Sequence, residues 1–197
     1  MPAGNRLLAP ILLDGAVASQ MINQGIDPFR DRLSRDIRND LSESLLTCLA
    51  QHQLTAAQAV ATRYLTNDPA PCYAAYIHDR LNRYTRFLAL VAGGPADVVW
   101  QGFALWDLGL FFEVHEILEQ AWLHSCGAEK TFLQALIRAA GVYIKRECGF
   151  YDAAAKMAAK AIPVLAANRH RLAVYTDPER LLTALGSATE KPPLLLS

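Results

Sequence analysis

Hydrophobic residues recur at intervals of three and four along most of this chain, whereas the strict alternation of apolar and polar residues that marks strands is scarce. Alanine and leucine, both strong helix formers, dominate the apolar positions. The sequence therefore predicts an all-α protein. Its clearest helix follows Asp27-Pro28 and ends near Gln51. The apolar stripe of this helix repeats every four residues and consists of Leu33, Ile37, Leu41, Leu45 and Leu49.

Turn residues and helix caps divide the remainder into further helices. They are expected over residues 55–65, 73–91, 96–108, 110–124, 129–147 and 151–167. A last short helix is expected to be capped by Asp177, with Pro178 in its first turn, and to end near Leu185. Residues 191–197 are expected to form a loose tail.

The strongest break in the chain is Gly93-Gly94-Pro95. It separates an N-terminal helical region (1–95), to which no role is assigned, from a central part (96–170) and a short helix with its tail (171–197). Glycines punctuate the central part at short intervals, and short loops make consecutive helices antiparallel neighbours. The central part is therefore predicted to be an antiparallel bundle of about four helices, with the N-terminal region as a helical extension.

Charge argues against binding to nucleic acid or to anionic membranes, because 19 Lys and Arg balance 19 Asp and Glu and the pI is about 7.0. The first predicted helix does carry four arginines, namely Arg30, Arg32, Arg35 and Arg38. Acidic residues stand four positions away from two of them (Asp31 with Arg35, Arg32 with Asp36), so a solvated, self-paired face is favoured over an RNA-binding one. The same balance of charge disfavours RNA binding through Lys145-Arg146.

The cysteines indicate a reducing compartment. They lie far apart, without a C-x-x-C pair, at Cys48, Cys72, Cys126 and Cys148. This pattern argues against a zinc knuckle, a thioredoxin-type motif and a secreted disulfide framework. The apolar run 7–18 is interrupted by Pro10 and Asp14 and lacks a convincing cleavage pattern, and no segment reaches the roughly 18 apolar residues of a membrane span. A cytoplasmic protein without a membrane segment is predicted.

Candidate chemistry concentrates between Phe111 and Trp122, where three carboxylates and one imidazole fall within seven residues. At about 100° per residue, Phe112, His115, Glu119 and Trp122 share one strip of the predicted helix. Glu116 lies at the edge of that strip, and Glu113 is expected to turn towards solvent. The adjoining core stripe consists of Val114, Ile117, Leu118 and Ala121.

An imidazole and a carboxylate four residues apart, flanked by two aromatic rings, would be partly desolvated. Desolvation raises the pKa of a carboxyl group towards the working pH, as a general base requires. His and Glu at this spacing can also supply half of a metal site. However, H-E-x-x-E differs from H-E-x-x-H, and no third ligand is evident on another helix, so no metal set and no cofactor is assigned.

Residues 129–147 are predicted to lie beside this strip, with Gln134 and Arg138 on the facing side. An ion pair between Arg138 and Glu119 is geometrically plausible. Three interpretations stay open. His115 and Glu119 are either satisfied by Gln134 or Arg138 and fix the register of a helix interface, or they form a ligand or catalytic site, or they belong to a solvated face.

The stretch over about residues 103–165 resembles the prokaryotic and plastid family known as domain of unknown function 309. The resemblance rests on the Phe-Phe-Glu-x-His-Glu-x-x-Glu-x-x-Trp run at 111–122, the Phe-Leu-Gln-x-Leu-Ile run at 132–137, and Gly149 with the alanine-rich stretch after it. Two positions depart from the family pattern, which usually has glycine at Ala135 and glutamine at Arg138. The resemblance implies a small helical bundle in which Glu113, His115, Glu116, Glu119 and Trp122 belong together, and it brings no activity with it.

Two functions follow as hypotheses. In an enzyme or small-molecule binding protein, Glu119 would act as base and His115 as acid or orienting group, with Glu116 beside them. The substrate would be contacted by Gln134, Arg138, Glu113, Phe112 and Trp122. Alternatively, the chain is a helical-hairpin scaffold that grips a peptide, since its segments at Gly109 and Gly149 loosely resemble tetratricopeptide units. Those glycines stand 40 residues apart, against about 34 in that family. A homo-oligomer is possible in either case.

Overall fold

The computed structural model describes residues 25–187 and 191–196, and within them the regular structure is helical throughout. The prediction of an all-α fold is therefore confirmed. The helices are α2 (Arg32–Gln51), α3 (Thr55–Leu65), α4 (Pro71–Ala92), α5 (Val98–Asp107), α6 (Phe111–Leu123), α7 (Gly127–Glu147), α8 (Tyr151–Ala167), α9 (Arg169–Leu172) and α10 (Pro178–Gly186). Only the short α9 lacks a counterpart among the expected helices.

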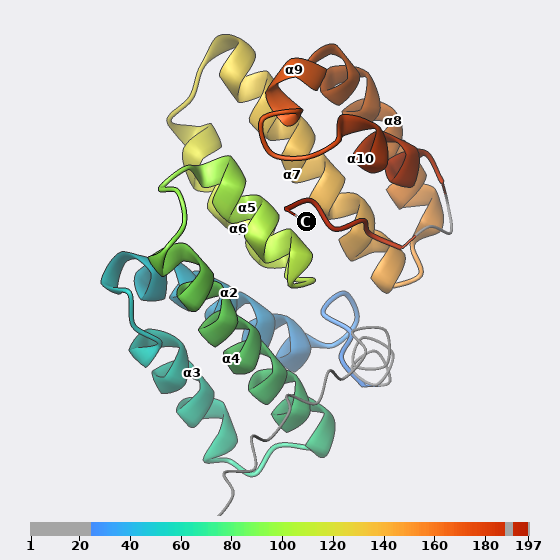
Figure 1. Ribbon diagram of the computed structural model, residues 1–197. Helices are drawn as coiled ribbons and strands as arrows, with labels where there is room; N and C mark the ends of the chain where they lie inside the picture. The colour runs from blue at the N-terminus through green and yellow to red at the C-terminus, as the bar shows by residue number, and fades with distance from the viewer. Residues whose placement is uncertain (1–24, 188–190, 197) are drawn as a thin grey trace, which may run out of the picture.

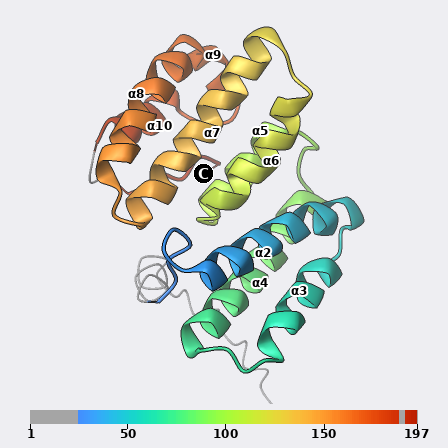
Figure 2. The ribbon, with the colours of Figure 1, turned by 180° about the vertical axis from the view of Figure 1, so that it is seen from behind.

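The helices form two groups that share one hydrophobic core. In Figure 1, α2, α3 and α4 lie together below, and α5 to α10 lie above them. Consecutive helices of the upper group pack as antiparallel neighbours, most extensively α6 with α7 and α7 with α8. Helix α6 also contacts α2, so it lies between the two groups, as the view from behind shows (Figure 2). One cluster of buried side chains runs from Ile26 to Leu195.

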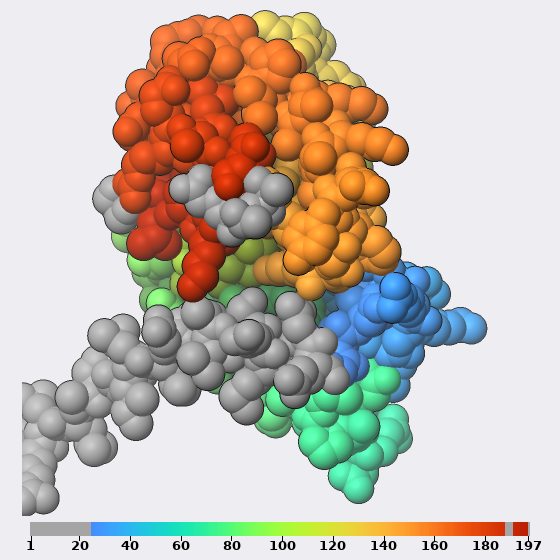
Figure 3. All heavy atoms as spheres, turned by 90° about the vertical axis from the view of Figure 1, so that its right-hand side faces the viewer, coloured from blue at the N-terminus to red at the C-terminus, as the bar shows by residue number. Residues whose placement is uncertain are grey.

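The start of the described chain closes one side of the boundary between the groups. Figure 3 shows these first residues, in blue, against the C-terminal part of α7, in orange. Phe29 meets the ring of Phe150 edge-on at 5.2 Å between centroids, and the Lys145 Nζ lies 3.9 Å from the centroid of Phe29. The division into 1–95, 96–170 and 171–197 remains a prediction.

Local sequence explains where the helices that hold the site begin. The carboxylate of Asp31 caps α2 by accepting from the backbone N–H groups of Leu33 and Ser34. Between α5 and α6 stands Gly109 with φ of +68°, a conformation that favours glycine. A Cβ there would also lie 2.8 Å from Arg83 Nη1, so a side chain at this position would displace the end of the Arg83 side chain. Arg83 of α4 donates from Nη1 to the Leu108 carbonyl oxygen at 2.8 Å, which joins this turn to α4.

The prediction of a loose C-terminal tail is wrong for residues 191–196. Leu195 is buried, with 1% of its surface exposed. The N–H groups of Leu195 and Leu196 donate to the two oxygens of Asp107 at 2.6 and 2.9 Å, and the indole N–H of Trp106 donates to the Pro193 carbonyl oxygen. The apolar end of the chain buries its leucines, while Asp107 at the end of α5 accepts the backbone groups that burial would otherwise leave unpaired.

Other predictions concern single residues or segments. In α2, Ile37, Leu41 and Leu45 are buried as expected, but Leu33 is exposed. The four cysteines are free. The apolar run 7–18 and Ser197 lie outside the described residues. Among the described residues, no helix combines the length and the apolar character needed to cross a membrane.

Candidate functional site

Helix α6 presents the two faces that its sequence predicts. Val114, Ile117 and Leu118 are buried, and Ala121 packs against the same core. The predicted strip of Phe112, His115, Glu119 and Trp122 is half-buried. This rotation of the helix follows from its apolar positions, because burying them turns the strip towards the edge of the core.

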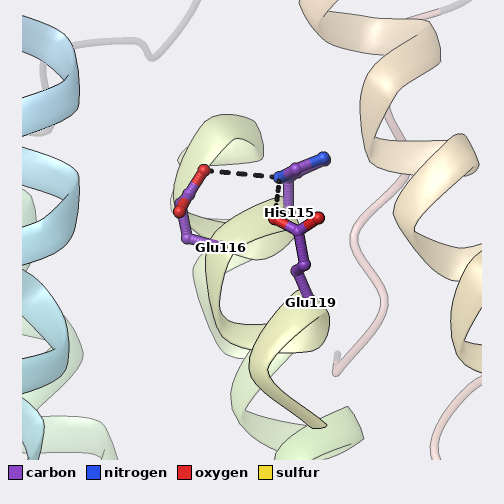
Figure 4. A group of neighbouring side chains, drawn as sticks. All are labelled: His115, Glu116 and Glu119. Carbon is purple, nitrogen blue, oxygen red and sulfur yellow. Dashed lines mark ion pairs between the residues drawn. The ribbon is translucent and has the colours of Figure 1, made fainter. Parts of the chain in front are cut away.

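His115, Glu116 and Glu119 form a cluster on this strip, which we call the α6 cluster (Figure 4). Both carboxylates turn towards the same imidazole nitrogen. The Nδ1 of His115 lies 3.4 Å from Glu116 Oε1 and 3.8 Å from Glu119 Oε2. The side chains are 33%, 21% and 43% exposed in chain order, so the cluster is open to solvent on one side.

The Nδ1 of His115 is the unusual atom of the cluster. It is buried and has no hydrogen-bond partner among the described residues, although two carboxylate oxygens lie near it. One donor atom from each of the three residues can be chosen so that all lie within 4.8 Å of one another. With a neutral imidazole, the α6 cluster carries two negative charges, which match one divalent cation.

The ring of Phe112 orients the imidazole. The two rings stack at 6.2 Å between centroids, with 9° between their planes. Arg38 of α2 lies with its guanidinium carbon 3.9 Å from the centroid of Phe112. Arg38 was predicted to lie on a solvated outer face. That prediction is wrong for Arg38, which is half-buried because α2 packs on α6, but the predicted pair of Arg32 with Asp36 is present at 3.5 Å.

Glu113 does not face solvent as predicted, since only 1% of it is exposed. Tyr84 Oη donates to Glu113 Oε1 at 2.7 Å, and Arg80 Nε lies 3.8 Å from the same oxygen. Burial and the neighbouring Glu113 raise the pKa of Tyr84 well above its ordinary value, so the phenol remains a donor. Glu113 thus joins α6 to α4, and sequence reasoning did not single out its two partners, which stand four residues apart.

The remaining predicted site residues, Trp122, Gln134 and Arg138, are not members of the α6 cluster. Trp122 is half-buried and packs under the Nζ of Lys130, which lies 4.2 Å from the centroid of its ring. Gln134 and Arg138 are half-buried on α7. Within residues 25–187 and 191–196, no hydrogen bond or ion pair joins either of them to His115 or Glu119, so the plausible pair of Arg138 with Glu119 is not formed.

No other predicted helix supplies an evident third metal ligand for His115 and Glu119. The third candidate donor is instead Glu116, which follows His115 directly. Neighbouring residues on a helix point about 100° apart, and the length of the glutamate side chain brings its carboxylate back to the imidazole.

Residues 99–157 match the family model DUF309, described as a domain of unknown function. The DUF309 match spans α5, α6, α7 and the first part of α8, and it contains the whole α6 cluster. It confirms the resemblance that the 111–122 run indicated. Neither the curated proteins nor the solved structures contain a match to the chain.

Proposed function

We propose that this protein binds a divalent transition-metal ion through the α6 cluster, and that the open coordination positions of the ion receive a small molecule. The observation that supports this most is the buried Nδ1 of His115, which faces two carboxylates without a hydrogen bond. A buried polar atom without a partner is costly. A metal ion between the three side chains would satisfy it.

The spacing of the donor atoms suits such an ion. Zinc binds imidazole nitrogen and carboxylate oxygen at about 2.0–2.2 Å, so two ligands of a tetrahedral ion lie about 3.3–3.5 Å apart. His115 Nδ1 and Glu116 Oε1 already have this separation, at 3.4 Å. Glu119 Oε2, at 3.8 Å, needs only a small side-chain rotation. Imidazole with carboxylates favours zinc and the neighbouring first-row ions over calcium.

Solvent exposure of the α6 cluster supports a reactive rather than a purely structural ion. Structural zinc sites are closed by four protein ligands, whereas catalytic sites have three and leave a position for water or substrate. The α6 cluster offers three, and Glu119 is 43% exposed. An ion held there would polarise a bound carbonyl or phosphoryl group, or lower the pKa of bound water to about 7, which are the elements of a hydrolytic reaction.

Titration calorimetry with Zn²⁺ tests this proposal. The full-length chain, freed of metal with a chelator, is expected to bind one ion, and His115→Ala or Glu119→Gln is expected to weaken binding by about tenfold or more. His78→Ala is the matched control, because His78 is exposed on α4, away from the α6 cluster. Equal affinity for Zn²⁺ in all four proteins would refute the assignment.

The alternative function, a helical-hairpin scaffold that grips a peptide, is favoured by the same exposure. Glu119 is open to solvent, and the α6 cluster does not line the cavity formed beside it by Arg38, Arg80, Arg83 and Phe112. In that case Glu119 would contact a partner directly. Absence of metal binding in the calorimetric experiment would favour this alternative.

A further inference from the structure

A second candidate site lies next to the α6 cluster but does not include it. A cavity of about 70 Å³ opens between the two helical groups, and three arginines and a glutamate supply its charged lining: Arg38, Arg80, Arg83 and Glu147. Phe29, Phe112 and Ile144 contribute apolar walls. A cavity of this size exceeds the roughly 10–15 Å³ that one water needs, so it has room for a small organic molecule.

Arg80 is partly satisfied in this cavity: its guanidinium carbon lies 4.7 Å from the centroid of the Tyr76 ring, and the Tyr76 side chain also interacts with its charge. The Nε and Nη1 atoms of Arg80 are buried and have no hydrogen-bond acceptor among the described residues. The nearest carboxylate oxygen, on Glu113, lies 3.8 Å from Nε, which is too far for a hydrogen bond. A buried N–H without an acceptor is destabilising, and two on one guanidinium indicate that an acceptor belongs in this cavity.

Arg38 adds a cation that the described residues do not neutralise. Its Nε and Nη2 donate to the amide oxygen of Asn39, a neutral acceptor, and no carboxylate of the described chain lies within ion-pair distance. Partial burial lowers its pKa, against the opposing effect of Tyr76 and Glu113. Arg83, by contrast, is held by Asp79 and by the carbonyl oxygen of Leu108, and so forms a fixed wall.

The balance of charge limits which anion fits. Arg80 faces Glu113, and Arg83 faces Asp79. Among the charged residues that line the cavity, Arg38 and Glu147 form no ion pair with another residue of the described chain. Burial raises the pKa of Glu147 to about 7, so the charge of Arg38 is opposed by that of Glu147 above this pH and is unopposed below it. The cavity therefore suits a monoanion and disfavours a dianion such as a phosphate monoester. A guanidinium fork matches the two oxygens of a carboxylate. Aromatic and aliphatic walls suit a short apolar body.

We propose that this cavity binds a small carboxylic acid, with Arg38 and the free N–H groups of Arg80 on its carboxylate and Phe29, Phe112 and Ile144 around its apolar part. This site stands apart from the proposed metal site, because none of His115, Glu116 and Glu119 lines the cavity. Phe112 is common to both, since it lines the cavity and stacks on His115.

Binding of butyrate to the full-length chain tests this proposal. The buffer contains a chelator, so that bound metal does not contribute. In ligand-observed NMR, butyrate is expected to bind and its neutral amide, butyramide, is not. Arg38→Gln is expected to weaken butyrate binding by about tenfold. At pH 8, above the raised pKa of Glu147 of about 7, Glu147→Gln is expected to strengthen it several-fold because a repelling charge is removed. Arg32→Gln, an exposed position of the same helix, is the control and leaves binding unchanged.

Three results would overturn the carboxylate site. They are equal binding of butyrate and butyramide, butyrate binding that is unaffected by Arg38→Gln, and binding of inorganic phosphate in preference to butyrate. Since Arg38 makes no ion pair within the described chain, Arg38→Gln is expected to fold, and its melting temperature checks this directly.

Discussion

Replacing Glu113 with glutamine tests the buried polar contact that joins α6 to α4. Glutamine has the same shape and still accepts a hydrogen bond from Tyr84, but the Arg80 guanidinium loses its nearest negative charge. Removing one partner of a buried ion pair costs about 3–5 kcal/mol. Because the Arg80 side chain is 13% exposed and its Nε lies 3.8 Å away, the lower end of that range, about 3 kcal/mol, applies here.

For a chain of this size, about 3 kcal/mol corresponds to a fall of roughly 6–12 °C in melting temperature. Thermal unfolding followed by circular dichroism measures it, with Glu43→Gln as control because Glu43 is exposed on α2. The double variant Arg80→Met with Glu113→Gln is expected to lose less stability than the sum of the two single variants. Each single variant leaves one buried charge without its partner, whereas the double variant leaves none. A fall below about 2 °C for Glu113→Gln, or full additivity in the double variant, would refute the reasoning.

Three further predictions concern Glu119, Asp107 and Asp31. Metal-free Glu119→Gln is expected to melt within about 2 °C of the native chain, because exposed pairs contribute little; a fall of several degrees would show that Glu119 is structural. Asp107→Asn is expected to speed removal of the C-terminal residues by carboxypeptidase, since an amide nitrogen cannot accept an N–H from Leu195 or Leu196; an unchanged rate would contradict the role of Asp107 in holding these residues. Hydrogen bonds from Ser34 lower the pKa of Asp31 to about 2. The contribution of this carboxylate to the free energy of unfolding is therefore present above about pH 4 and is lost as the pH falls towards 2. The difference in urea midpoint between the native chain and Asp31→Asn should therefore shrink over that range, and a constant difference would count against it.

The periodicity of apolar residues was enough to predict most helices, and it also placed the buried face of α6. It could not identify what covers Glu113. A helical projection shows that Glu113 points away from the strip of His115 and Glu119, but solvent and a neighbouring helix look the same in it. The partners, Arg80 and Tyr84, come from a helix about 30 residues earlier, and only tertiary packing brings them to this position.

Side-chain length explains the other differences. A projection assigns each residue one direction, so it separates Glu116 from His115, whereas the glutamate in the fold reaches back to the imidazole. Arg38 likewise projects from a charged face of α2, but its guanidinium reaches over Phe112 and lines the cavity. Long polar side chains can cover apolar surface in this way, and periodicity carries no information about it.

X-ray absorption at the zinc edge tests the central claim most directly, because it identifies the atoms that hold the ion. The native chain loaded with one Zn²⁺ is expected to show only nitrogen and oxygen neighbours at about 2.0–2.2 Å, including one imidazole, and the imidazole signal should disappear in His115→Ala. Sulfur neighbours at about 2.3 Å would assign the ion to the free cysteines. That result, or a spectrum unchanged in His115→Ala, would contradict a metal site on α6.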